Sequence, residues 1–167
     1  MTLEARTVLR QLAARFGQPN KPQLDPLDEF VLTVLSQSTT DTNRDRAWTT
    51  LLKHFPNPNK QAGVQVAWAD VRQLGREKLE DLIRVAGLAG QKAGTIHAAL
   101  DRLAAEVGEL TLDHLNSMDD KEAIDYLTSF KGVGVKTAAC VLCFSLHRPV
   151  LPVDTHVFRI ARRLGWI

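Results

Sequence analysis

The most constraining feature of this sequence is a pair of glycines between two apolar runs. Gly132 and Gly134 stand one residue apart, and residues 121–130 and 135–144 on either side repeat apolar side chains at the spacing of a helix. Glycine adopts backbone conformations that other residues rarely reach, so two helices can meet here in a very short connection. The pattern therefore predicts two helices joined by a tight hairpin over about residues 121–145.

The rest of the chain has the same helical spacing and the residues that begin and end helices. Asp25 is expected to cap a helix with Pro26 at its first position, and Asp41 is expected to cap another. Besides the hairpin pair, we expect helices at 3–16, from 26 to an interruption at 36–40, and at 43–55, 66–74, 78–86, 92–107, 112–116 and 155–164. No segment alternates with the period of a strand, so the predicted fold class is all-α.

Charge is distributed unevenly along the chain. The net charge is only +2 over 167 residues, but residues 121–167 carry seven Lys and Arg against three acids. The positive field is therefore concentrated around the hairpin, as expected for contact with nucleic acid. No run approaches the length of a membrane span, and the N-terminus lacks the apolar core of a signal peptide. We therefore expect a cytoplasmic, DNA-associated protein without membrane contact.

The hairpin has a chemical interpretation and a purely structural one. Lys131, Gly132, Val133 and Gly134 are predicted to contact a phosphate, because backbone N–H groups that open a helix can point at an anion. Glycines also end helices and fill tight connections between them, and this alternative remains open. Lys136 can be a solvated cation or a phosphate contact, and in its neutral form a lysine is a nucleophile toward an electrophilic sugar carbon.

Asp154 also has two possible roles. An aspartate before Thr155 is a good helix cap, and an ionised carboxylate next to a sugar cation stabilises developing positive charge. Both roles can hold at once. His156 could bind phosphate, but a role in helix packing is favoured. Other residues are expected to be structural: the tryptophans at 48, 68 and 166 in the core, and Cys140 with Cys143 as reduced thiols.

Two loops can act as wedges in a base stack. Gln37, in the polar break between two helices, and Leu88, in a glycine-containing loop, could fill the gap left by an extruded nucleotide. Spacing alone favours a simpler interpretation, in which one loop caps a helix and the other ends one.

These residues resemble those of the helix-hairpin-helix DNA glycosylases, in particular the endonuclease III branch. The resemblance runs from about Asp25 to Ile167 and rests on four segments: residues 35–41, Gly87-Leu88 with Lys92-Ala93, the hairpin at 132–138, and residues 152–159. It implies a fold of two all-α lobes with a DNA-binding cleft between them. Residues 1–24 and 151–167 would then belong to the second lobe and residues 25–150 to a helical barrel domain.

The same resemblance implies roles for individual residues. Lys136 matches the lysine that forms a Schiff base, and Asp154 matches the catalytic aspartate. Gln37 and Leu88 match the intercalating positions, and Lys92 is counted among the expected DNA contacts.

The implied activity is a bifunctional base-excision repair glycosylase and abasic-site (β-elimination) lyase for oxidised pyrimidines in duplex DNA. The protein is expected to act as a monomer. Two alternatives remain: a mismatch or alkylation glycosylase of the same fold, and a module that grips abasic or bent DNA without chemistry.

The sequence departs from the family pattern in two places. Lys131 stands where the family usually has proline, which adds a cation and loosens the hairpin. The chain also stops at Ile167, where relatives continue to a four-cysteine loop holding a [4Fe–4S] cluster, so the second, iron–sulfur lobe is expected to be incomplete. In an incomplete lobe Trp166 and its neighbours would be left exposed or covered by self-association. Two cysteines are too few for that cluster, and we expect no metal site or cofactor here unless the native protein continues past Ile167.

Overall fold

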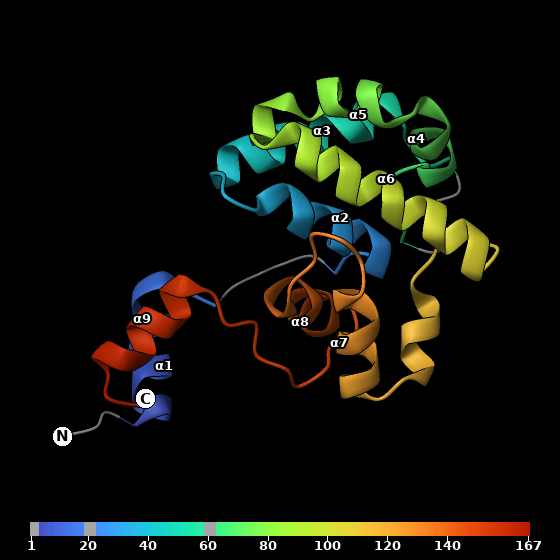
Figure 1. The fold of residues 1–167 in the computed structure, drawn as a ribbon. Helices are drawn as coiled ribbons and strands as arrows, with labels where there is room; N and C mark the ends of the chain where they lie inside the picture. Colours follow the sequence, from blue (N-terminus) through green and yellow to red (C-terminus); the bar gives the residue numbers. More distant parts are fainter. Residues whose placement is uncertain (1–3, 19–22, 59–62) are drawn as a thin grey trace. The chain divides into compact units, whose positions relative to one another are not determined.

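The computed structural model describes residues 4–18, 23–58 and 63–167, and it is built of helices (Figure 1). The helices are α1 (Ala5–Phe16), α2 (Pro26–Ser36), α3 (Asp41–His54), α4 (Trp68–Leu74), α5 (Arg76–Leu82), η2 (Arg84–Ala86), α6 (Ala89–Glu106), η3 (Asp113–Ser117), α7 (Asp120–Thr128), α8 (Val135–Phe144) and α9 (Thr155–Arg163). The β structure in the described ranges is limited to one isolated bridge between Pro56 and Val66. The predicted all-α class is confirmed. None of the helices described is both long and apolar enough for a membrane crossing.

The chain divides into two compact units. One consists of residues 1–23 and 153–167 and contains α1 and α9, neither of which has a buried residue. In this unit the side chain of Trp166 is 40% exposed. The core position expected for Trp166 from its spacing is therefore wrong, whereas its exposure agrees with the expectation stated for an incomplete second lobe. Helical spacing shows which face is apolar but not whether another element covers that face.

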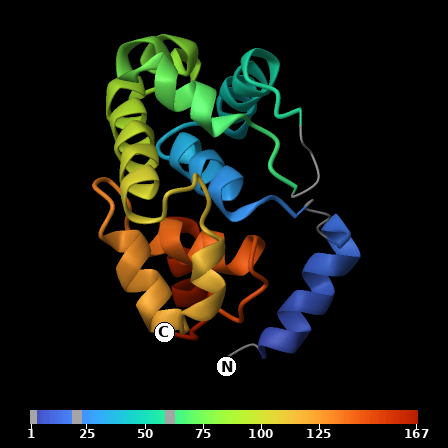
Figure 2. The same cartoon turned by 90° about the vertical axis from the view of Figure 1, so that its right-hand side faces the viewer.

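The larger unit, residues 24–152, is organised around α2. In Figures 1 and 2 this helix lies between α6 and the pair α7–α8, and it also packs against α3. Its N-terminus follows the prediction: the side chain of Asp25 accepts a hydrogen bond from Leu27 N at 2.9 Å, and Pro26 is the first helical residue. Trp48 and Trp68 are both buried in this unit, as predicted, with ring centroids 6.3 Å apart.

Several helix starts differ from the prediction, those of α3 and α6 among them. The cap of α3 is Thr40 and not Asp41: the Thr40 side chain accepts from Asn43 N, while Asp41 lies in the first turn and pairs with Arg44 at 2.7 Å. Helix α6 begins at Ala89, three residues before the predicted start. Only Gly87 and Leu88 separate η2 from α6, so residues 89–91, which were expected in a loop, form the first turn of the helix.

A buried carboxylate ties the N-terminal part of α2 to the start of α4. Asp28 Oδ1 accepts from the indole Nε1 of Trp68 at 2.8 Å, and its Oδ2 accepts from Gln65 N at 2.6 Å. Burial disfavours the charged form and raises the pKa of Asp28 from its usual 3.8 to about 6, although both hydrogen bonds act in the opposite direction. The group therefore binds a proton more tightly in the folded chain than in the unfolded chain.

This burial predicts a pH dependence of stability. Between about pH 4 and pH 6 the folded state holds a proton on Asp28 that the unfolded state has lost, so the contribution of Asp28 to stability falls as the pH rises through that window. Two pKa units correspond to about 3 kcal/mol. We expect the free energy of unfolding of the wild type, relative to Asp28→Asn, to fall by about this amount from pH 4 to pH 7 in urea titrations. An equal difference at both pH values would contradict the assignment.

Candidate nucleic-acid interface

The turn between α7 and α8 is held against α6. In Figure 1 this loop rises toward α6, and Gly132 in the loop has a φ of +85°, in the left-handed region that glycine readily adopts. A Cβ placed on Gly132 would collide with the hydroxyl oxygen of Thr95 on α6. Both the backbone conformation and the close approach to α6 therefore require glycine at this position.

Gly134 is in a different situation. Its φ of −103° suits any residue, and a Cβ added there would meet no atom within 4 Å. It occupies the N-cap of α8, where no side chain caps the helix, and the adjoining Val135 is 64% exposed. The first N–H groups of a helix have no partner inside the helix. This end of α8 therefore presents uncapped backbone donors, which suit an anion.

Val133 has a structural role between the two glycines. Its side chain is only 7% exposed and belongs to the core, and its N–H donates to Phe130 O at 3.1 Å. The predicted DNA contact of Val133 therefore involves neither its side chain nor its N–H. The neighbouring Lys131 is exposed, so its side chain is accessible to a phosphate.

The residue before the turn is anchored by aromatic contacts. The ring of Phe130 packs against Phe30 of α2 and, edge to face, against Tyr126 of α7, with centroids 5.7 and 5.3 Å apart. The guanidinium of Arg102 on α6 lies over Phe130, 4.5 Å from its centroid, and donates to the Ser129 hydroxyl at 2.6 Å. Contacts of this kind fix the start of the hairpin relative to α2 and α6.

The two predicted catalytic residues lie at the starts of two helices. Lys136 is the second residue of α8 and is half-buried, next to the uncapped N-terminus. Asp154 caps α9, since its Oδ1 accepts from His156 N at 2.9 Å and from Val157 N at 2.8 Å. The predicted capping role of Asp154 is confirmed. Lys136 belongs to the larger unit and Asp154 to the smaller one, so their convergence on one point stays a prediction.

One of the two predicted wedge residues contacts the hairpin. The side-chain Nε2 of Gln37 donates to Gly132 O at 3.3 Å and to the Thr137 hydroxyl at 3.4 Å, about a hundred residues away in the sequence. Leu88 is 52% exposed and has a left-handed backbone, with a φ of +50°. A leucine rarely adopts this conformation, so the surrounding structure must impose it. Sequence reasoning missed the partners Thr95 and Thr137, because nothing local marks a residue that a distant loop will contact.

The structure corrects the expected role of Lys92. Its side chain is 2% exposed, and its Nζ donates to Leu35 O at 2.8 Å and to Ala86 O at 2.7 Å. Burial lowers the pKa of this ammonium. Because the group points into the protein and both of these acceptors are main-chain carbonyls, Lys92 is not placed to contact a phosphate.

The number and placement of the cysteines do not fit the [4Fe–4S] cluster that relatives of the resembling family carry. Such a cluster takes four cysteine thiolates, and the chain has two cysteines, Cys140 and Cys143, both on α8. Neither forms a disulfide, and Cys140 is buried. Over the described ranges, no group of three His, Cys, Asp or Glu side chains is arranged to hold a metal ion.

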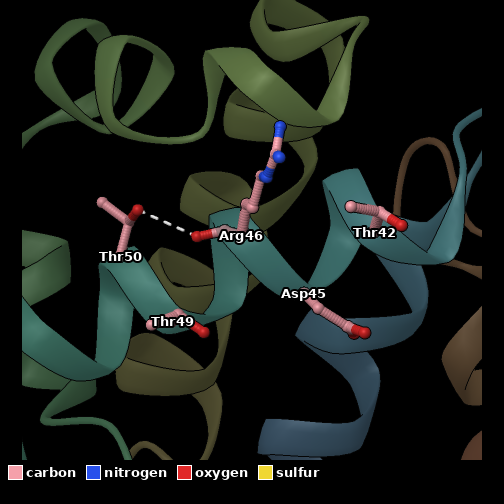
Figure 3. Close-up of a pocket in the computed structure, with 5 residues that line it drawn as sticks. All are labelled: Thr42, Asp45, Arg46, Thr49 and Thr50. Carbon is pink, nitrogen blue, oxygen red and sulfur yellow. Dashed lines mark hydrogen bonds between the residues drawn. The ribbon is translucent and has the colours of Figure 1, made fainter.

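A shallow hollow on the outer face of α3 is shown in Figure 3. It is lined by Thr42, Asp45, Arg46, Thr49 and Thr50, and the Thr50 hydroxyl donates to Arg46 O at 2.9 Å. All five residues come from one helix, and none of the predicted site residues lines the hollow. It is therefore a feature of the surface of α3 and not a pocket built around the hairpin.

Comparison with known proteins gives consistent matches. The family described as HhH-GPD superfamily base excision DNA repair protein matches residues 31–167. An Arabidopsis thaliana protein named as a putative DNA glycosylase is 43% identical over 141 residues, which cover 84% of this chain and 45% of that protein. Endonuclease III of Thermotoga maritima is 34% identical over 158 residues, which cover 95% of this chain and 65% of that enzyme. The chain thus spans about half to two thirds of these relatives.

Solved structures extend the likeness to the fold. A trapped covalent intermediate of endonuclease III with DNA superposes with a TM-score of 0.74 at 28% sequence identity, covering 97% of this chain and 68% of that one. These matches support the endonuclease III branch and the two-lobed fold that the resemblance implied, of which this chain is a part.

The contrast between the two glycines gives a stability prediction. Gly132→Ala must strain a left-handed backbone and displace Thr95, and we expect it to lower the free energy of unfolding by about 1–3 kcal/mol. Gly134→Ala adds a methyl group in open space and should change stability by less than about 1 kcal/mol. Thermal and denaturant unfolding of the two variants would check this. Equal destabilisation would mean that the contact with α6 does not hold the hairpin.

Proposed function

The chain belongs to the HhH-GPD superfamily of base excision DNA repair proteins, and from that premise we propose that it is a DNA glycosylase and abasic-site lyase acting on oxidised pyrimidines in duplex DNA. The observation that carries this proposal is the position of Lys136. It lies in the first turn of α8, two residues after Gly134, at a helix end that no side chain caps and where the space beside Gly134 is open. A phosphate bound at that helix end would place the DNA backbone next to a primary amine.

In the proposed reaction the amine of Lys136 replaces the damaged base. Its Nζ, in the neutral form, attacks C1′ of an extruded nucleotide while the N-glycosidic bond breaks, and the base leaves with the bonding electrons and a proton. The carboxylate of Asp154 stabilises the positive charge that develops on the sugar. The C1′–O4′ bond then breaks as O4′ takes up a proton and Nζ loses one, which opens the sugar ring and leaves an imine between Nζ and C1′.

The imine accounts for strand cleavage in the proposal. It acidifies the hydrogen on C2′, and removal of that proton expels the 3′-phosphate by β-elimination. Water then hydrolyses the imine and regenerates Lys136. An enzyme with the aspartate alone would use water as the nucleophile and stop at the free base. Lys136 is therefore the residue that favours lyase activity, and the trapped covalent complex of the related endonuclease III supports this assignment.

The proposed DNA contacts follow from the same surface. The exposed side chain of Lys131 and the donors of Gly134 would bind phosphate, and such contacts position the protein without reading sequence. Gln37 and Leu88 would enter the duplex where the nucleotide is displaced. Gln37 already contacts the hairpin, which supports placing a wedge next to the phosphate site.

Covalent trapping tests the nucleophile. With duplex DNA containing thymine glycol or an abasic site, borohydride should reduce the imine to a stable adduct that shifts on a denaturing gel. Lys136→Gln should form no adduct, because an amide cannot form the imine. Lys121→Gln, an equal charge change on the exposed face of α7, serves as the control and should trap normally. An adduct that persists in Lys136→Gln would refute the assignment.

Asp154→Asn separates the capping role from catalysis in the same assay. Asparagine caps helices well and keeps the Oδ1 acceptor, so α9 should remain intact. Loss of the charge should reduce base release by about a hundredfold or more, with DNA binding almost unchanged. Unaltered turnover would leave Asp154 with the capping role alone.

Gly134 provides the test of the phosphate site. Gly134→Val puts a side chain into space that is open in the protein but that a bound phosphate would occupy. We expect duplex affinity to fall about tenfold for every sequence and lesion, with little change in thermal stability. Fluorescence anisotropy at fixed salt would measure the affinity. Wild-type affinity in a folded Gly134→Val protein would show that this end of α8 does not bind DNA.

A further inference from the structure

The buried ammonium of Lys92 has a position that its local sequence does not reveal. It lies in the first turn of α6 and reaches two main-chain carbonyls, Leu35 O and Ala86 O, at 2.8 and 2.7 Å. A buried cation is costly unless it is well hydrogen-bonded. A leucine or methionine would fill similar space at this position without the cost of burying a charge.

Both carbonyls lie at the C-terminal ends of helices. Leu35 is in the last turn of α2, and Ala86 is the last residue of η2. Carbonyls at such ends have no N–H partner within their own helix, and α2 also directs the negative end of its dipole there. The ammonium therefore satisfies acceptors on two different segments and favours the charge distribution at the end of α2.

The two loops predicted to act as wedges follow these carbonyls within two residues. Residues 37–40 follow the end of α2, and Gly87-Leu88 directly follows Ala86. Each loop contains a non-glycine residue with a left-handed backbone: Ser38 and Leu88 both have a φ of +50°. Backbone of this kind persists only where neighbouring structure holds it in place. A single buried side chain thus lies at the base of both strained loops.

We propose that Lys92 is a positioning residue: its buried ammonium holds the two loops at a fixed separation, so that Gln37 and Leu88 enter the duplex together. This inference rests on the proposed function, because it assumes that both loops enter DNA. The clamp preorganises the loops, which removes the need to order them during nucleotide extrusion. The hydrogen bonds of its ammonium go to Leu35 O and Ala86 O and not to the hairpin, so we expect it to act mainly on extrusion and much less on phosphate affinity.

The clamp is tested with two substitutions in the full chain. Lys92→Met removes the donors at similar volume, and Lys92→Gln keeps two N–H donors on a side chain one atom shorter. Leu103→Ala, a buried position near the other end of α6, is the control for lost core stability. If Lys92→Met does not fold, Lys92→Gln is compared with Leu103→Ala instead.

Extrusion is followed by the fluorescence of 2-aminopurine placed next to a thymine glycol, and duplex affinity is measured by anisotropy. We expect the Lys92 variants to slow the fluorescence rise by roughly tenfold or more, because a small misplacement of positioning groups has large rate effects. Affinity should stay within about threefold, since phosphate contacts dominate binding. A rise as fast as in Leu103→Ala, or a loss of affinity equal to the loss of rate, would overturn the clamp.

Leu88→Ala distinguishes failure of the clamp from failure of the proposed function. If Leu88→Ala leaves the fluorescence rise of the wild type unchanged, the loop does not enter DNA and the premise is wrong. If Leu88→Ala slows the rise and the Lys92 variants do not, the loops enter DNA without a clamp at Lys92.

Amide hydrogen exchange gives a readout that a general loss of stability would not reproduce. In the Lys92 variants, exchange should increase selectively at residues 37–40 and 87–90. In Leu103→Ala it should increase across the whole larger unit. The same exchange pattern in both kinds of variant would reduce Lys92 to an ordinary core residue.

Discussion

The arrangement of the larger unit depends on the burial of α2 on nearly all sides. Nine of its eleven residues are buried, most of them apolar, because α3, α6 and α8 pack around it. The polar groups near both ends of α2 must then find hydrogen-bond partners inside the protein. Asp28 bonds to Trp68 and Gln65 near the N-terminus, and the ammonium of Lys92 meets the carbonyl of Leu35 near the C-terminus.

The same packing places the hairpin. Because α8 packs on α2, the loop that follows α2 lies beside the turn before α8, and Gln37 bonds to Gly132 O and the Thr137 hydroxyl. The close approach of Gly132 to Thr95 fixes the turn against α6. The proposed phosphate site and the proposed wedges are thus held by one set of helix contacts. A change in the packing of α2 would move both together.

The two glycines of the hairpin serve different purposes that the sequence pattern does not separate. Gly132 is needed by the protein itself, since its backbone is left-handed and α6 leaves no room for a Cβ. Gly134 has an ordinary backbone and free space around it, so the folded chain alone does not require glycine there. The proposed function accounts for glycine at this position, because it gives Gly134 a phosphate contact.

Helical periodicity and end signals were enough to predict the all-α class, the cap and first proline of α2, and the hairpin between two helices, because each depends on residues close together in the chain. The prediction that Lys92 contacts DNA failed for the opposite reason: its acceptors, Leu35 O and Ala86 O, belong to segments that meet only when the chain folds. The contacts of Gly132 and Gln37 could not be found from local pattern for the same reason. The sequence determines which helix faces are apolar and which helix ends are capped. The burial of a given side chain, and hydrogen bonds between residues about a hundred positions apart, depend on how the helices pack.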